Sequence, residues 1–311
     1  MDKRAVGAWL ALLLAAVVGI VLGVSLNGEE EAQAAPWERV ASMSQRRSYI
    51  AAAKLDGRIY TAGGMVGETG RPLALASRYD AVADRWEVLP RLPVETRAAA
   101  GAAVDGRFYV IGGTTPEGNT DAVWAYDPAR EEWEERAPLP EPRFNHAAVA
   151  LDGKIWVLGG YLEGEERREV YVYDPATDTW DEGPPLPLAM HAFGAVPFRG
   201  ELWVIGGRVG QDVLRTVWIL DPKTGRWREG PAMPKPMELL GATVAGSEIH
   251  ALWESTYQIY DARTGRWRSG PPPTVTRHAL QLFRVGDGLY AVGGCTTALR
   301  DSPVVEFRPV N

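Results

Sequence analysis

The sequence predicts an all-β protein in which one unit is repeated six times and closed into a ring. Three observations predict this fold: a composition rich in turn-forming and aromatic residues, a recurrent glycine pair, and a tyrosine and a tryptophan at constant spacing. The 311 residues include 34 Gly, 23 Pro and 12 Trp, which favours many short strands joined by turns over long helices.

Charge and cysteine content narrow the classes of partner and site. The chain has 33 Lys and Arg against 40 Asp and Glu, a formal net charge of −7. No basic run lies outside the N-terminus, so the sequence offers no electrostatic footprint for DNA or RNA and no nucleic-acid partner is expected. The single cysteine, Cys295, excludes an intramolecular disulfide and a cysteine-based zinc or iron–sulfur site.

Residues 1–35 are predicted to be a signal or anchor segment followed by an acidic linker. Lys3 and Arg4 precede an uncharged apolar run over residues 5–24, which as a helix would span about 30 Å, the thickness of a bilayer core. Basic charge before this run and acidic charge after it orient the rest of the chain outside the cytoplasm. We therefore expect one N-terminal apolar helix that anchors an extracytoplasmic domain in the membrane.

A cleaved signal peptide is the alternative for the same segment. Ala32-Gln33-Ala34 has the small-x-small pattern of a cleavage site, and cleavage after Ala34 would release a secreted or periplasmic protein. The length of the apolar run and the acidic residues between it and this site favour the anchor, but both interpretations stay open.

A glycine pair ends the same apolar motif in five units. The motif reads GRIYTAGG, GRFYVIGG, GKIWVLGG, GELWVIGG and GLYAVGG, and its pairs are Gly63 and Gly64, Gly112 and Gly113, Gly159 and Gly160, Gly206 and Gly207, and Gly293 and Gly294. Five units also carry a tyrosine, or in one case a leucine, seven residues before a tryptophan. These tryptophans are Trp86, Trp133, Trp180, Trp227 and Trp267. In the remaining unit SEIHALWE stands where its neighbour has GELWVIGG, so a degenerate fifth unit completes six.

The two ends of the repeat region complement each other. The last unit reaches Phe307 in the tyrosine slot and ends without a tryptophan, whereas residues 36–40 supply an unmatched Trp37. Because pairing these segments would remove both free sheet edges, we predict that the N-terminal strand closes the ring. The ring domain then covers residues 36–311.

These motifs resemble the kelch repeat, with the Gly-Gly, Tyr and Trp at the positions of that family. The resemblance implies a six-bladed β-propeller of four-stranded antiparallel blades around a central channel, similar to the central domain of galactose oxidase. It gives the ten glycines and the six tryptophans a structural role. A fold of this kind says little about function, because it hosts many unrelated activities.

Chain geometry indicates which residues can meet a ligand. In such a blade, the segment that enters the first strand and the loop between the second and third strands emerge at one face, here called the loop face. Ligand-binding candidates lie on these entering segments: Arg47, Arg97, Arg143, His146, His191, Arg277 and His278. An arginine fork suits two-point recognition of a carboxylate. Trp253, beside the shortened loop of the fifth unit, would either stack on a sugar or fill the space that the loop leaves.

Each candidate has a structural alternative. The arginines recur in kelch units and could pair within the ring, and the histidines occupy different slots, so no metal site is expected. Cys295 is expected to be a small buried thiol. Glu238 is the only acidic residue at an entering position, and it could act as a general base or as a counter-ion to the arginines.

Two functions follow from these residues. The chain has no G-x-S-x-G, H-E-x-x-H, P-loop or dinucleotide fingerprint, so no cofactor is expected and the first hypothesis is a non-enzymatic module that binds a protein or a glycan. The alternative is a mutarotase or epimerase of an acidic sugar, similar to the sialic acid mutarotases that share the fold. Arg47, Arg143 and Arg277 would then hold the carboxylate while Glu238 moves the proton. A copper radical oxidase would need a ligand set that four scattered histidines do not supply.

Overall fold

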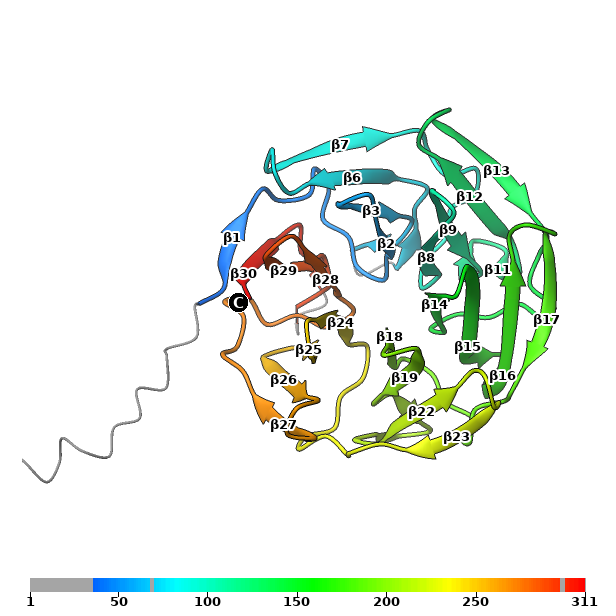
Figure 1. Ribbon diagram of the computed structural model, residues 1–311. Coiled ribbons are helices and arrows are strands. Elements are labelled where there is room, and N and C mark those ends of the chain that lie inside the picture. Colours follow the sequence, from blue (N-terminus) through cyan, green and yellow to red (C-terminus); the bar gives the residue numbers. More distant parts are fainter. Residues whose placement is uncertain (1–35, 68–69, 297–299, 311) are drawn as a thin grey trace, which may run out of the picture. The chain divides into compact units, whose positions relative to one another are not determined.

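A computed structural model of the protein describes residues 36–67, 70–296 and 300–310, and they form six four-stranded antiparallel sheets arranged as blades around a channel (Figure 1). The described residues contain no helix, so this domain is all-β as predicted. The predicted N-terminal helix and the candidate cleavage site lie outside the described residues. In the part of the chain that is described, no helix has the length and apolarity that a membrane span requires.

Each blade runs from an inner strand at the channel to an outer strand at the rim. Blade one contains β2 (Ala51–Leu55), β3 (Arg58–Ala62), β6 (Ala76–Asp80) and β7 (Arg85–Leu89), and blade two contains β8 (Ala100–Val104), β9 (Arg107–Ile111), β12 (Val123–Asp127) and β13 (Glu132–Arg136). Blade three contains β14 (Ala147–Leu151), β15 (Lys154–Leu162), β16 (Glu165–Asp174) and β17 (Thr179–Gly183), and blade four contains β18 (Gly194–Phe198), β19 (Glu201–Ile205), β22 (Val217–Asp221) and β23 (Arg226–Glu229).

The last two blades follow the same order. Blade five contains β24 (Gly241–Ala245), β25 (Glu248–Trp253), β26 (Thr256–Asp261) and β27 (Arg266–Ser269), and blade six contains β28 (Gln281–Val285), β29 (Gly288–Val292), β30 (Val305–Pro309) and β1 (Glu38–Val40). Small hairpins decorate three of the loops between second and third strands: β4 (Met65–Val66) with β5 (Arg71–Pro72), β10 (Thr114–Thr115) with β11 (Gly118–Asn119), and β20 (Arg208–Val209) with β21 (Asp212–Val213).

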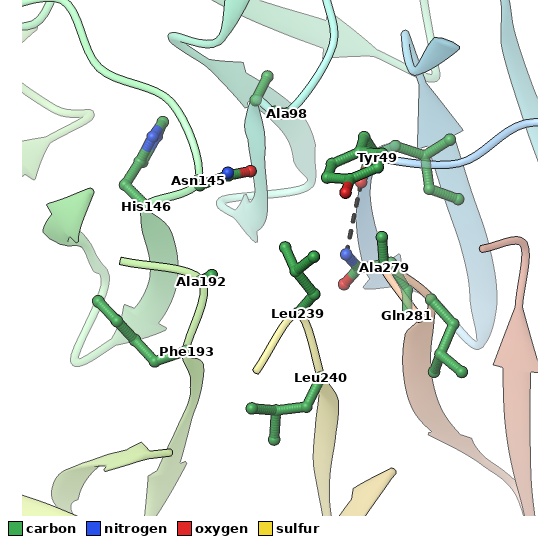
Figure 2. A pocket seen from close by; sticks show the side chains of 13 residues that line it. Tyr49, Ala98, Asn145, His146, Ala192, Phe193, Leu239, Leu240, Ala279 and Gln281 are labelled. Carbon is green, nitrogen blue, oxygen red and sulfur yellow. Dashed lines mark hydrogen bonds between the residues drawn. The ribbon is translucent and has the colours of Figure 1, made fainter. Parts of the chain in front are cut away.

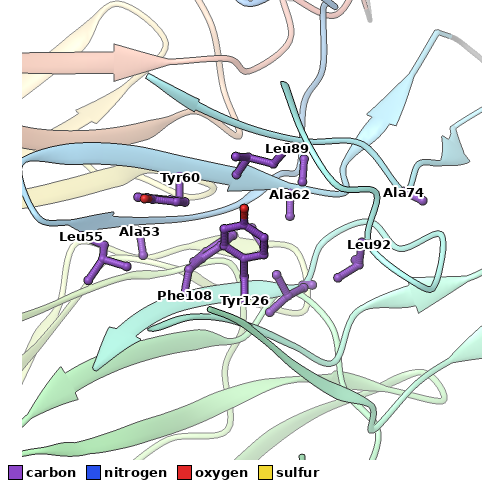
Figure 3. Packing of buried hydrophobic residues seen from close by; sticks show 13 residues of the cluster. Ala53, Leu55, Tyr60, Ala62, Ala74, Leu89, Leu92, Phe108 and Tyr126 are labelled. Carbon is purple, nitrogen blue, oxygen red and sulfur yellow. The ribbon is translucent and has the colours of Figure 1, made fainter. Parts of the chain in front are cut away.

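The hydrophobic core is divided among the six interfaces between neighbouring blades. One apolar cluster fills each interface. Between blades one and two, for example, Tyr60 of β3 packs against Phe108 and Tyr126 of blade two (Figure 3). A blade therefore buries its two faces only against its neighbours, and the ring must close for all six interfaces to form.

The tryptophans join neighbouring blades around the outside of the ring. In five blades the tryptophan lies directly across from the tyrosine-slot residue, as in the pair Tyr79 and Trp86. Each indole N–H also donates to a backbone carbonyl that follows the outer strand of the preceding blade. The six bonds are Trp37 to Pro271, Trp86 to Ala41, Trp133 to Pro90, Trp180 to Ala137, Trp227 to Pro184 and Trp267 to Pro231, at 2.7–3.1 Å.

The ring closes as predicted, with one correction to the register. Strand β1 pairs with β30 and completes blade six, and Trp37 is 3% exposed. The tyrosine slot of blade six, however, is filled by Arg308 and not by Phe307, because Arg308 faces Leu289 as Tyr79 faces Ile59 in blade one. The guanidinium of Arg308 lies 5.3 Å from the centroid of the Tyr257 ring and donates to its hydroxyl, so a cation replaces the missing aromatic.

The second glycine of each pair links its blade to the next. Gly64 has a φ of 95°, and a Cβ there would lie 2.7 Å from the carbonyl oxygen of Ser48, so only glycine fits without strain. Its N–H donates to the carbonyl of the residue that enters the next blade. The six bonds run around the whole ring: Gly64 to Thr96, Gly113 to Arg143, Gly160 to Met190, Gly207 to Met237, Glu254 to Arg277 and Gly294 to Arg47. In blade five Glu254 keeps the bond with a φ of 52°.

Loss of the Trp37 side chain should destabilise the closed ring. We expect Trp37→Ala to lower the free energy of unfolding by about 3–5 kcal/mol, because it removes a buried aromatic from the interface of blades five and six. Urea denaturation followed by tryptophan fluorescence measures this loss. As a comparison, Trp227→Ala removes an aromatic that is only half-buried. It lies in blade four, whose four strands all come from one continuous segment of the chain. An equal or larger loss in Trp227→Ala would contradict a special role for the N-terminal strand.

Candidate functional site

Three consecutive positions of each entering segment have three different environments. The first, the buried position, lies inside the blade: Arg47, Thr96, Arg143, Met190, Met237 and Arg277. The second, the face position, is on the loop face: Ser48, Arg97, Phe144, His191, Glu238 and His278. The third, the neck position, has φ between 45° and 59° and encircles the channel: Tyr49, Ala98, Asn145, Ala192, Leu239 and Ala279 (Figure 2).

Three of the predicted ligand-binding arginines occupy the buried position and are used by their own blades. Arg47, Arg143 and Arg277 are each at most 3% exposed. Each donates to the carbonyl of the first glycine in its blade, at 2.9–3.1 Å. They stabilise the backbone around the glycine pair, so their guanidinium groups do not face a ligand on the loop face.

Other donors of these arginines find partners inside the blade, while the Nε atom of each is buried without a hydrogen-bond partner. Arg47 donates to the hydroxyls of Thr61 and Ser77, and Arg277 donates to the carboxylate of Glu306 at 2.6 Å, with both side chains fully buried. Burial lowers the pKa of Arg47 to about 10, which leaves it charged at neutral pH. In blades four and five methionines fill the position with apolar packing instead.

Arg97 stands one position later than the other arginines and therefore reaches the loop face. The buried position of blade two holds Thr96, whose hydroxyl makes the bond to the carbonyl of Gly112 that an arginine makes elsewhere. Arg97 is half-buried, its Nη1 lies 3.5 Å from the sulfur of Met65, and no carboxylate of the described residues lies within 4.0 Å of it. The shift of one residue, visible in the sequence, separates the arginine that can meet a ligand from those that cannot.

A pocket of about 420 Å³ opens beside Arg97 between blades one, two and three. It is lined by Tyr49, Met65, Arg97, Ala98, Thr114, Asn119, Phe144 and Asn145. The set combines one guanidinium, two carboxamides, two hydroxyls and two aromatic rings. Such a lining can bind a carboxylate through charge-assisted hydrogen bonds while the rings cover its apolar neighbours.

The channel narrows directly below this pocket. The six neck residues surround one small space, and the carboxamide of Asn145 is directed into it (Figure 2). Backbone hydrogen bonds join neighbouring neck residues at five of the interfaces, from Ala98, Asn145, Ala192, Leu239 and Ala279 to the preceding blade. Gln281 of blade six reaches the carbonyl of Ile50 at 3.5 Å across the remaining one (Figure 2). The neck is therefore a rigid floor for the pocket.

Glu238 lies on the loop face as the sequence suggests, but its counter-ion is another residue. Both of its carboxylate oxygens accept from Arg208, at 3.2 and 3.3 Å, and its side chain is 15% exposed. His191 lies next to this pair, 3.8 Å from Glu166 and 4.9 Å from the centroid of the Tyr161 ring. Burial lowers the pKa of His191, opposed by the nearby carboxylate of Glu166. Glu238 does not contact Arg47, Arg143 or Arg277. The arrangement of these four residues that the sequence suggested for a mutarotase is therefore not formed.

The remaining histidines do not converge. His146 is buried between blades two and three, where burial lowers its pKa to about 3. The Nε2 atom of His278 lies 3.0 Å from the sulfur of Cys295, a buried thiol whose pKa is raised to about 11 by burial and by Asp301. Across residues 36–67, 70–296 and 300–310, no three or more metal-ligating side chains come together.

Trp253 fills space at the end of β25, beside the shortened loop of blade five. It is half-buried and packs on the apolar cluster between blades four and five. Beside it, a turn of only Glu254 and Ser255 joins β25 to β26. Of the two roles open from the sequence, the structure supports packing in place of the shortened loop.

Sequence reasoning missed most of the pocket. Tyr49, Asn119, Phe144 and Asn145 carry no motif, and only their register relative to the glycine pairs could have placed them on the loop face. The pairing of Arg208 with Glu238 likewise has no signal in the sequence.

The buried and the exposed arginine positions should differ in their effect on stability. Glu306→Ala leaves Arg277 buried without its carboxylate and should cost about 3–5 kcal/mol in urea denaturation. Arg97→Ala should change stability by no more than about 0.5 kcal/mol, as expected for a partly exposed side chain. Equal losses in the two variants would contradict the assignment of the buried position to structure.

The buried His146 should make the domain sensitive to acid. Its pKa of about 3 lies below the ordinary 6.5, so the unfolded chain binds more protons between these values and stability falls as pH drops through this window. At pH 5 the cost is about 2 kcal/mol. We expect His146→Leu to show a smaller loss of stability between pH 7 and pH 5 than the unchanged protein. Parallel curves for the two proteins would rule out this contribution.

Comparison with known proteins agrees with this geometry. Residues 49–252, about two-thirds of the chain, match the KLHDC2/KLHL20/DRC7 kelch-repeats domain. No curated protein matches the sequence. The solved structure of YjhT is similar, with a TM-score of 0.74 and 15% identity over 85% of this chain and 95% of that one, which supports the fold alone. The chain belongs to the kelch-repeat family of β-propellers.

Proposed function

We propose that the protein is a binding module whose loop face takes a segment of a partner protein, with a carboxylate of that segment at Arg97. The observation that supports this most is the pocket beside Arg97, because its guanidinium has no carboxylate partner within the described residues. An arginine in a partly dehydrated pocket gains more from a bound carboxylate than one in open water.

The other walls of the pocket suit a peptide side chain. Tyr49 and Phe144 offer apolar surface for the methylene groups that carry a carboxylate, and Asn119 and Asn145 offer both donors and acceptors. A rigid neck below them preorganises the site, which lowers the entropic cost of binding. A glycan with a carboxylate presents the same chemistry and is the other source that the experiment must distinguish.

A second candidate is the isomerisation of an acidic sugar. It is favoured by Glu238, whose carboxylate is on the loop face with Arg208, whereas Arg47, Arg143 and Arg277 no longer have a part in it. In this mechanism Glu238 would transfer the proton with Arg208 beside it, and Arg97, three blades away, would take no part. Exchange spectroscopy by NMR on N-acetylneuraminate would show faster anomer exchange with the protein than with Glu238→Gln.

The proposed site of action is outside the cytoplasm, with the domain held at the membrane by its N-terminal segment. The support is the apolar run over residues 5–24 and the charges around it. Protease added to intact cells should cleave the domain if this proposal holds.

Substitution of Arg97 should abolish binding of acidic peptides. We would test the full chain, in mild detergent, against an array of ten-residue peptides that carry one glutamate and no other charge, with glutamine versions beside them. We expect Arg97→Ala to weaken the glutamate peptides at least tenfold, about 1.4 kcal/mol. Arg226→Ala, which changes an exposed arginine on the outer strand of blade four, should leave binding unchanged.

Two results would overturn the protein-binding proposal. Equal binding of the glutamate and glutamine peptides would exclude the carboxylate. Binding of N-acetylneuraminate or glucuronate without any peptide, lost in Arg97→Ala, would identify a glycan as the ligand of the same pocket.

A further inference from the structure

The loop face carries opposite charges on opposite blades. Arg97 enters blade two and Glu238 enters blade five, and these blades are three apart in a ring of six. Arg97 and Glu238 form no ion pair with each other. One wall of the channel mouth therefore has an arginine without a carboxylate partner, and the opposite wall has a carboxylate that is paired with Arg208.

Tyr49 lies within electrostatic reach of both walls. Burial raises the pKa of its hydroxyl to about 12, the negative charge of Glu238 contributes in the same direction, and Arg97 opposes it. Tyr49 also lines both the pocket beside Arg97 and the neck. A ligand held in the pocket beside Arg97 therefore contacts Tyr49.

Glu238 keeps capacity for a second cation. Its two bonds to Arg208 are long, at 3.2 and 3.3 Å, and they come from a single nitrogen atom. A carboxylate has about four lone-pair sites, so an ammonium group can bind beside the arginine.

The rim of the loop face is lowest at blade five. Six residues lead from Glu254 to Tyr260, whereas thirteen lead from Gly113 to Tyr126 in blade two. The first path is a two-residue turn, and the second contains the hairpin of β10 and β11. Blade three also has a long connection, because β15 and β16 continue as one hairpin past the glycine pair. Of blades two, three and five, blade five therefore leaves the most room for a chain to enter from the side, over the turn at Glu254 and Ser255.

We propose that the partner segment is an extended polypeptide that enters over the low rim of blade five and crosses the mouth to blade two, with a basic residue at Glu238 and an acidic residue at Arg97. This inference rests on the proposed function and adds a direction and a charge pattern to it. Extended peptides fit because side chains of one strand alternate, so a residue of each charge can point toward the mouth while the backbone stays above it. The two unlike charges also reject a segment that lies the other way round.

The charge pattern can be tested with designed peptides on the full chain. The probes are acetylated and amidated peptides in which one lysine and one glutamate are separated by zero to four Gly-Ser pairs, with single-charge versions as references. We expect one separation to bind at least tenfold more tightly than either single-charge peptide, and Glu238→Gln to remove this advantage. Glu238→Gln should leave the peptide that has only a glutamate unaffected.

The direction of entry can be tested by raising the rim. Replacing Ser255 alone by residues 114–121 of blade two adds a hairpin to blade five and keeps Glu254, whose N–H donates to the carbonyl of Arg277. We expect this graft to weaken the best two-charge peptide at least tenfold, while acetyl-glutamate amide, which fits the pocket alone, binds as before. The thermal unfolding temperature of the graft, measured alongside, checks that the ring stays folded.

The outcomes separate the two proposals. If the two-charge peptides gain nothing over the glutamate peptide, or if the graft changes no affinity, the crossing segment is wrong and the pocket at Arg97 stands. If Arg97→Ala weakens none of the probes, the proposed function itself fails.

Discussion

The backbone hydrogen bond from the second-glycine position of each blade to the next entering segment is the contact on which the structure depends. This bond occurs once at each of the six interfaces between blades. It requires a residue with a positive φ whose Cα lies close to a neighbouring carbonyl oxygen. Since each blade buries its apolar faces only against its neighbours, this bond sets the distance at which the six core clusters form. The hydrogen bonds from the tryptophan indoles also join neighbouring blades, at the outer rim of the ring.

The same contact decides which side chains are free to bind. It fixes the entering residue in place, so that one position points into the blade, the next onto the loop face and the third into the neck. An arginine at the first position becomes part of the scaffold, as Arg143 does. An arginine at the second position, Arg97, becomes part of a pocket. A shift of one residue along the chain thus changes a structural group into a candidate recognition group.

Irregularities in the repeat fall where the proposed function needs them. Blade five lacks both the glycine pair and the long loop, and this lowers the rim next to Glu238. Blade two places its arginine out of register, directly across the channel. Departures from the repeat at functional positions are expected, because the regular parts already satisfy the fold.

The sequence by itself determined the repeat number, the class of fold and the closure by Trp37, because each depends on local spacing that recurs along the chain. It placed Phe307 in the tyrosine slot, but the slot belongs to Arg308, because an extra residue in that unit can be counted only from the strand register. Which arginines are buried, which carboxylate pairs with Arg208 and which side chains form the pocket were decided by the tertiary structure. These relations join residues from different blades, and their distances follow from packing around the ring and not from any pattern within one unit.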